Sequence, residues 1–256
     1  SEMCIRDSHG GLPLLAPMSQ VAGRMSIQAG ASALEAPRGG AGLLLGGVPG
    51  VPSARVVVIG GGVVGENAIE MAIGLGAQVN VLDRDLDVLG RLARRFGAEL
   101  ETVYSTTGAL EHLVTNADLV IGAVLLRGAR APKLVTADMV KQMRPGSVLV
   151  DVAIDQGGCF ETSRPTTHAE PTFVVDGVVH YCVANMPGAV PKTSTYALNN
   201  ATLPFTLAIA DKGVRQALLD DAHLLNGLNV HRSLLTEREV SDAQGLDYTD
   251  PFLAVS

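Results

Sequence analysis

Short apolar runs alternate with segments of helical periodicity through the middle of the chain. The run 55–59 (RVVVI) is continuous and β-branched, which is typical of a strand buried on both faces. Strands are predicted at 43–45, 55–59, 78–82, 102–104, 119–123, 147–154, 173–175 and 178–183, and helices at 18–36, 66–75, 86–96, 108–116 and 136–143. Ser19 is the expected N-cap of the first helix. The regular alternation predicts an α/β fold with a parallel sheet.

The regular alternation of predicted strands and helices ends past Asp155. A polar loop (QGGCFETSRPTTHAEPT) is followed by a helix at 193–209, which Pro204 is expected to interrupt, and by amphipathic helices over 212–256. The first eight residues, SEMCIRDS, carry no periodicity and look like read-through of a sequencing adaptor, with an ordinary disordered terminus as the alternative. We therefore expect an artefactual or disordered segment at 1–11, an α/β domain at 12–191 and a helical part at 192–256.

Composition excludes several classes of protein. Of 256 residues, 47% are hydrophobic and only 18% are charged, which excludes a disordered chain. The net charge of −7 argues against nucleic-acid and polybasic membrane partners. Three cysteines cannot form a paired disulfide framework, and no apolar run is long enough for a membrane helix. These features predict a soluble protein of the cytoplasm.

Gly60, Gly62 and Gly65 form a G-x-G-x-x-G motif directly after the run 55–59 and at the start of a helix. In this context the first glycine allows a tight turn, the second lets the backbone approach a pyrophosphate, and the third lets helix and strand pack closely. Asp83 ends the next strand, where a carboxylate would hold both ribose hydroxyls and repel a 2′-phosphate. The motif predicts a Rossmann-type, doubly wound domain that binds NAD rather than NADP, although Arg84 could soften that preference. A glycine turn with a surface aspartate is the alternative.

Two polar residues follow later strands at the edge where parallel sheets bind ligands. Asp155 follows SVLVDVAI and precedes two glycines, so it could exchange a proton beside a nicotinamide or simply cap a turn. Asn185 in VANMP has donors and an acceptor suited to a carboxamide or a substrate, or it forms a turn before Pro187. Asp151 lies within the predicted strand and is expected to make structural hydrogen bonds.

The remaining candidates give weaker signals. The histidines at 112, 168, 180, 223 and 231 lack ligand spacing and are expected at the surface. Cys159 lies beside Gly158 without a partner that would indicate nucleophilic catalysis.

Several long segments together resemble the L-alanine dehydrogenase family. They include LPLLAPMSQVAGRMSIQAGA, GGVPGVPSARVVVIGGGVVGENA, DLVIGAVLLRGARAPKLVTADMV, GSVLVDVAIDQGGCFETSRPTTH and HYCVANMPGAVPKTSTYALNNATLPF, and the resemblance runs from about Leu12 to the C-terminus. It implies oxidation of L-alanine by NAD and water to pyruvate, ammonium and NADH. It also implies that a substrate-binding half precedes this chain, that 192–256 is the remnant of that second domain, and that the 256 residues alone are inactive.

The resemblance assigns roles to residues of this sequence. Asp155 would be the catalytic acid/base that activates the water attacking an imine, and Asn185 would also contact the substrate. The implied cofactor-binding residues are Ser19, Gly60, Gly62, Val63, Val64, Gly65, Asp83, Ser105, Val124, Leu125, Val152, Ala153, Ile154, Arg164, Val183, Ala184, Asn185 and Met186. The family also implies a homohexamer once the protein is complete.

Three positions depart from the family pattern, and two other functions stay open. Val88 stands where family members often carry a basic residue, and Ala208 and Lys212 replace a pair proposed to bind metal, so we predict no metal. One alternative is the NAD-binding alpha subunit of proton-translocating transhydrogenase, whose segments are related to AIDQGG and VANMP. The other is a fragment that only binds NAD.

Overall fold

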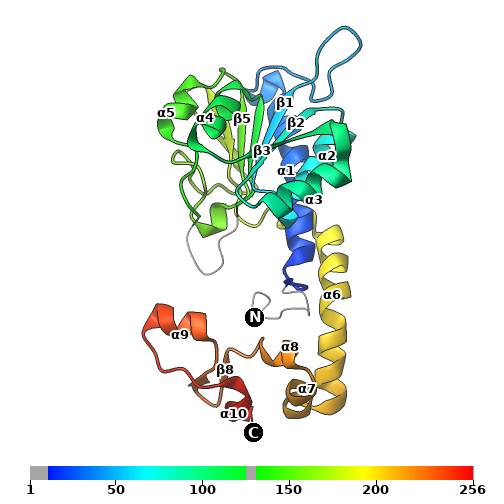
Figure 1. The fold of residues 1–256 in the computed structure, drawn as a ribbon, viewed down its shortest axis with the longest axis vertical. Coiled ribbons are helices and arrows are strands. Elements are labelled where there is room, and N and C mark those ends of the chain that lie inside the picture. Colours follow the sequence, from blue (N-terminus) through cyan, green and yellow to red (C-terminus); the bar gives the residue numbers. More distant parts are fainter. Residues whose placement is uncertain (1–10, 125–130, 256) are drawn as a thin grey trace. The chain divides into compact units, whose positions relative to one another are not determined.

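The computed structural model describes residues 11–124 and 131–255, which form two compact units (Figure 1). One unit is Gln20–Ala189, and the other comprises the described residues up to Ser19 and from Val190 onward. The segment 1–8 with Cys4, and Leu125, therefore lie outside the described residues. Among those described, no helix is long and apolar enough to cross a membrane.

The larger unit is built on a seven-stranded sheet in the order β3-β2-β1-β4-β5-β7-β6. The strands are β1 (Arg55–Ile59), β2 (Gln78–Asp83), β3 (Leu100–Tyr104), β4 (Leu119–Gly122), β5 (Val148–Asp151), β6 (Thr172–Val175) and β7 (Val178–Tyr181). All neighbours pair in parallel except β6, which pairs antiparallel with β7 at the edge. The order reverses between β1 and β4, and this reversal is where doubly wound sheets bind ligands. The predicted fold class is confirmed.

Helices flank both faces of this sheet. They are α1 (Ala16–Ala33), α2 (Val63–Gly74), α3 (Leu86–Phe96), α4 (Thr107–Asn116) and α5 (Ala137–Gln142), with short 3-10 turns η1 (Ala36–Arg38), η2 (Gly97–Glu99), η3 (Ile154–Gln156) and η4 (Met186–Ala189). Gly30 of α1 lies against Leu119 of β4, whereas the next strand residue, Val120, packs with α4 and α5. Successive strand residues point to opposite faces, so α1 lies across the sheet from α4 and α5.

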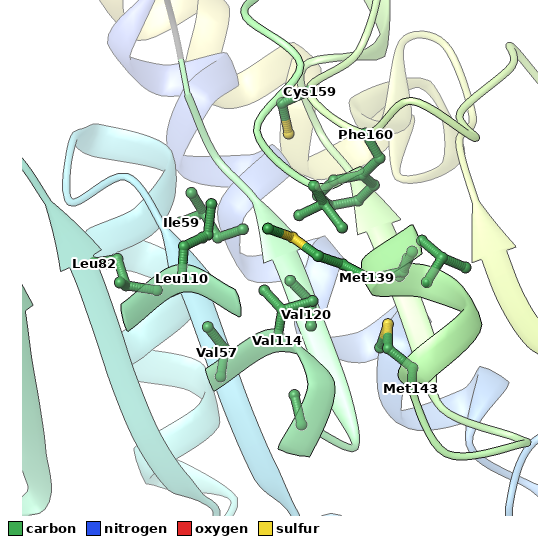
Figure 2. Close-up of a cluster of buried hydrophobic side chains, with 14 of the residues drawn as sticks. Val57, Ile59, Leu82, Leu110, Val114, Val120, Met139, Met143, Cys159 and Phe160 are labelled. Carbon is green, nitrogen blue, oxygen red and sulfur yellow. The ribbon is translucent and has the colours of Figure 1, made fainter. Parts of the chain in front are cut away.

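Figure 2 shows the apolar layer between the sheet and helices α4 and α5. Its labelled members are Val57, Ile59, Leu82, Leu110, Val114, Val120, Met139, Met143, Cys159 and Phe160, all of them buried. The strands contribute mainly β-branched side chains and the helices leucine, valine and methionine. Burial of this layer stabilises the packing of α4 and α5 against the sheet.

Most predicted elements differ from the structure by one to three residues at their ends, and three differences have a clear physical reason. Residues 43–45 form no strand, because Gly42 and Gly47 have positive φ and bend the chain, which leaves Leu44 exposed. Strand β5 ends at Asp151 rather than 154, since the Asp151 carboxylate accepts from the Ala153 N–H at 3.1 Å and turns the backbone. Ser19 lies inside α1, which begins at Ala16, so it is not an N-cap.

The smaller unit contains further helices and one two-stranded sheet. Its elements are α6 (Pro191–Lys212), α7 (Val214–Asp220), α8 (Ala222–Leu225), β8 (Val230–His231), β9 (Leu234–Leu235), α9 (Arg238–Gln244) and α10 (Pro251–Val255). Helix α6 continues through Pro204 instead of being interrupted there, because its 22 residues provide several turns on both sides of the proline, although Pro204 has no N–H to donate. The prediction of helices over 212–256 missed the β8–β9 hairpin. This hairpin turns at Arg232 and Ser233, which both have positive φ.

Candidate functional site

The glycine loop joins β1 to the first turn of α2. Gly60 has φ +101°, and a Cβ there would meet the Ala123 carbonyl oxygen at 2.8 Å. A Cβ on Gly65 would overlap the Gly60 carbonyl oxygen, so strand and helix pack at a distance that only glycine permits. Gly62 behaves differently, because nothing lies within 4 Å of its Cβ position. The loop is therefore tight on its inner side and open at Gly62, in front of the N-terminus of α2.

Asp83 ends β2 beside this loop. Its Oδ2 accepts a hydrogen bond from the Gly61 N–H at 2.7 Å, and its Oδ1 accepts from the Asp85 N–H at 2.9 Å. The side chain is half-buried. Each carboxylate oxygen can accept a further hydrogen bond, so the group is oriented by the backbone and still available to hydroxyl donors.

Asp151 and Asp155 lie close in sequence but in contrasting environments. Asp151 is fully buried and accepts from the N–H groups of Cys159 and Ala153 and from the hydroxyl of Ser163 at 2.5 Å. It makes structural hydrogen bonds, as predicted, although it ends β5 and holds the following turn together instead of lying within the strand. Asp155 lies in η3, is exposed, and its Oδ2 is 3.4 Å from the backbone nitrogen of Asn185. Asp155 is thus the carboxylate that faces solvent at this sheet edge.

Asn185 follows β7 and adopts a left-handed conformation with φ +55°. This conformation is uncommon for a residue other than glycine and accompanies the turn that places its N–H toward Asp155. Asn185 Nδ2 and His168 Nε2 lie 3.2 and 3.3 Å from the Cβ position of Gly188. The structure therefore brings together Asp155 and Asn185, each of which the sequence placed after a strand at the ligand edge, and adds His168 nearby.

Arg164 lies over the ring of Phe173, with its guanidinium carbon 4.3 Å from the ring centroid. Phe173 in turn stacks on His180 at 4.9 Å. The expectation of a surface His180 is wrong, because the ring is fully buried between Thr162, at 2.7 Å from Nε2, and the Val178 carbonyl, at 2.9 Å from Nδ1. Burial, the largest cause, lowers the pKa of His180 and so favours the neutral form of the ring.

An ion-pair network lies beside the glycine loop and has no counterpart in the sequence analysis. Glu66, in the first turn of α2, pairs with Arg91 and Arg95 of α3. Burial alone raises the pKa of Glu66, but the hydrogen bonds from Arg95 and Arg91 outweigh it and hold the pKa below its ordinary value. Glu70 extends the network to Arg95 at 2.7 Å and to Arg24 of α1 at 3.2 Å. Sequence spacing alone cannot reveal it, because its members come from three helices.

The comparison with known protein families agrees with this geometry. Residues 26–238 match the family described as alanine dehydrogenase/PNT, C-terminal domain. The chain belongs to this family. Membership in the alanine dehydrogenase/PNT family confirms the prediction of an NAD-binding Rossmann-type domain.

Known relatives extend the match in detail. The alanine dehydrogenase of Halomonas elongata is 67% identical over 241 residues, which cover 94% of this chain and 65% of that protein. The alanine dehydrogenase of Mycobacterium tuberculosis is 53% identical over 247 residues, covering 96% and 67%. A solved L-alanine dehydrogenase structure superposes with a TM-score of 0.92 at 52% identity, covering 96% of this chain and 68% of that one. The chain thus spans about two thirds of the length of these relatives.

The transhydrogenase likeness is weaker. A solved transhydrogenase from Sinorhizobium meliloti has a TM-score of 0.74 at 22% identity over 87% of this chain, which shows a shared fold. Identity to the alanine dehydrogenases is more than twice as high. The alanine dehydrogenase side of the family is therefore the better match.

The remaining predicted residues have definite places in the fold. Val63 and Val64 begin α2, and Val124 follows β4 next to the loop at Gly60. Ser105 follows β3 and donates its N–H to the Asp83 carbonyl at 2.9 Å. Val152 and Ala153 form the turn before η3, in which Ile154 precedes Asp155, and Val183, Ala184 and Met186 flank Asn185. Ser19 belongs to the other unit.

Among the described residues, no group of three His, Cys, Asp or Glu side chains could hold a metal ion.

Proposed function

We propose that the complete protein is an NAD-dependent alanine dehydrogenase that converts L-alanine and water to pyruvate and ammonium. The observation that carries this proposal is 67% identity to the Halomonas elongata alanine dehydrogenase across 94% of the chain. The glycine loop, Asp83 and the Asp155–Asn185 pair supply a site of the required chemistry on the ligand edge of the sheet.

The loop and its neighbours fit a dinucleotide. The open space at Gly62 admits a pyrophosphate to the unpaired N–H groups at the start of α2, where the helix dipole favours negative charge. Asp83 would accept from the ribose hydroxyls of the adenosine end. We assign the other cofactor contacts to Ser19, Val63, Val64, Ser105, Val124, Leu125, 152–154, Arg164 and 183–186.

Asp155 is assigned as the proton-transfer residue. Bound NAD would supply the hydride acceptor for the reaction. The Asp155 carboxylate is exposed and placed by the turn after β5, so it can take a proton from an attacking water. Asn185 would orient the substrate beside it. The residues that bind the substrate carboxylate would come from the N-terminal part of the protein, which the longer relatives contain in addition to the region matched by this chain.

An Asp83→Ala change is expected to weaken NADH binding by about 1–3 kcal/mol, because charge-assisted hydrogen bonds to the ribose are lost. The parent should bind NADH more tightly than NADPH, since the carboxylate repels a 2′-phosphate. Titration of the chain with each nucleotide, followed by nucleotide fluorescence, measures both effects. Asp87→Ala is the matched control, because Asp87 is an exposed carboxylate on the adjacent helix. Equal curves for NADH and NADPH on the parent would contradict the assignment of Asp83.

We further propose that the complete enzyme is a homohexamer of the cytoplasm. Apolar side chains of α6 that remain exposed in this chain, including Tyr196, Leu203 and Leu207, support burial in a larger assembly. The buried free thiols of Cys159 and Cys182 suit a reducing compartment. Sedimentation of the complete protein at micromolar concentration should give a hexamer, and a monomer would contradict this proposal.

A further inference from the structure

Arg91 of α3 contacts the glycine loop at Gly61. Its Nη2 donates to the Gly61 carbonyl oxygen at 3.2 Å. The Gly61 N–H donates to Asp83 Oδ2 at 2.7 Å. Both backbone polar groups of Gly61 are therefore held by charged side chains, one cationic and one anionic. Gly61 thereby joins Arg91 to the carboxylate assigned to the adenosine ribose.

The Arg91 guanidinium is itself held in place. Its Nη1 pairs with Glu66, whose side chain is only 16% exposed and whose other oxygen pairs with Arg95. Arg95 reaches on to Glu70 at 2.7 Å. A network of several partners fixes a long side chain more firmly than a single surface pair does.

Arg91 supplies positive charge at Gly61, whereas its helix neighbour Val88 supplies only an apolar contact. Val88 lies one helical turn before Arg91, and its Cγ1 lies 2.7 Å from the Cβ position of Gly61. Val88 therefore fills space at Gly61 without charge. Glu66 places a carboxylate in the first turn of α2, next to the N–H groups that would receive a pyrophosphate. Arg91 and Arg95 together balance that carboxylate.

We propose that Arg91 is a positioning residue for the adenosine-diphosphate half of the cofactor. It holds Gly61 in the conformation that orients Asp83, and it keeps the Glu66 carboxylate from repelling the anionic ligand. This inference rests on the proposed NAD site and adds to it a residue outside the glycine motif. The ligand class is a ribose linked to a diphosphate, for which ADP-ribose is the probe.

An Arg91→Ala variant of the 256-residue chain should bind ADP-ribose about 5- to 20-fold more weakly than the parent, the effect of one charge-assisted hydrogen bond at a half-exposed side chain. Calorimetric titration measures the affinity, and thermal unfolding checks that the variant is folded. Arg94→Ala is the matched control on the same helix, because the Arg94 guanidinium lies beside Gly90 instead of the glycine loop. It should leave the affinity unchanged. Arg91→Lys keeps the charge, so its affinity for ADP-ribose should lie between those of the parent and Arg91→Ala. This variant also tests the proposal if Arg91→Ala does not fold.

A second substitution separates electrostatic positioning from general packing. Adding Glu66→Gln to Arg91→Ala removes the carboxylate that Arg91 balanced, so the double variant should regain part of the lost affinity. A purely structural role of the ion pair predicts a further loss instead, and that result would overturn the proposal. Parent-like ADP-ribose binding by Arg91→Ala would overturn it as well. If the parent itself binds neither ADP-ribose nor NADH, the proposed nucleotide site fails together with this inference.

Discussion

An Asp155→Asn variant of the complete enzyme is expected to oxidise alanine about 10²- to 10⁴-fold more slowly than the parent, with NADH affinity nearly unchanged. The amide keeps the size of the carboxylate and an oxygen that can accept from the Asn185 N–H, so the turn should persist. It cannot take a proton at neutral pH. Because Asp155 is exposed and accepts a long hydrogen bond, 3.4 Å, from the Asn185 N–H, we expect folding to depend little on its charge.

The measurement can use a fusion of this chain to the N-terminal part of the Halomonas elongata relative, since the two proteins are 67% identical over the shared region. Alanine-dependent NADH formation gives kcat, and NADH titration gives the cofactor affinity. Asp138→Asn is a suitable control, because Asp138 is an exposed carboxylate on α5 whose ion pair with Lys141 is also at the surface. Full turnover by Asp155→Asn would remove Asp155 from the mechanism.

Asp151→Asn should have the opposite effect: it should lower the free energy of unfolding by about 2–4 kcal/mol and affect turnover per folded molecule much less than Asp155→Asn does. The Asp151 side chain is fully buried and accepts from several backbone N–H groups and from Ser163. An amide nitrogen in place of one oxygen would face these donors and leave at least one of them unsatisfied. Urea unfolding of the 256-residue chain measures the loss, and Asp155→Asn in the same chain should unfold like the parent.

The two variants together separate structure from catalysis. Activity per folded molecule in the fused protein should fall far less for Asp151→Asn than for Asp155→Asn. If Asp151→Asn unfolds at the same urea concentration as the parent but abolishes turnover, Asp151 has a functional role and our assignment of the two carboxylates is reversed.

Much of the larger unit could be predicted from local pattern. The continuous β-branched run 55–59 and the amphipathic segment Leu86–Phe96 form the strand and the helix that were predicted, because the first favours a strand buried on both faces and the second has a clear helical period. The segment 43–45 was too short for this and was bent by its glycines. His180 was misjudged because local polarity says nothing about the Phe173 ring that covers it.

The sequence by itself determined the α/β alternation, the glycine loop before α2 and the carboxylate at the end of β2, since each depends on neighbours within one βαβ unit. It also carried the family resemblance, through long matching segments. Only the tertiary structure decided that Asp151 is buried while Asp155 is exposed, and that Arg91 reaches Gly61. Those outcomes depend on which side chains the packed helices and the turn after β5 bring together, and such distant contacts leave no periodic signal along the chain.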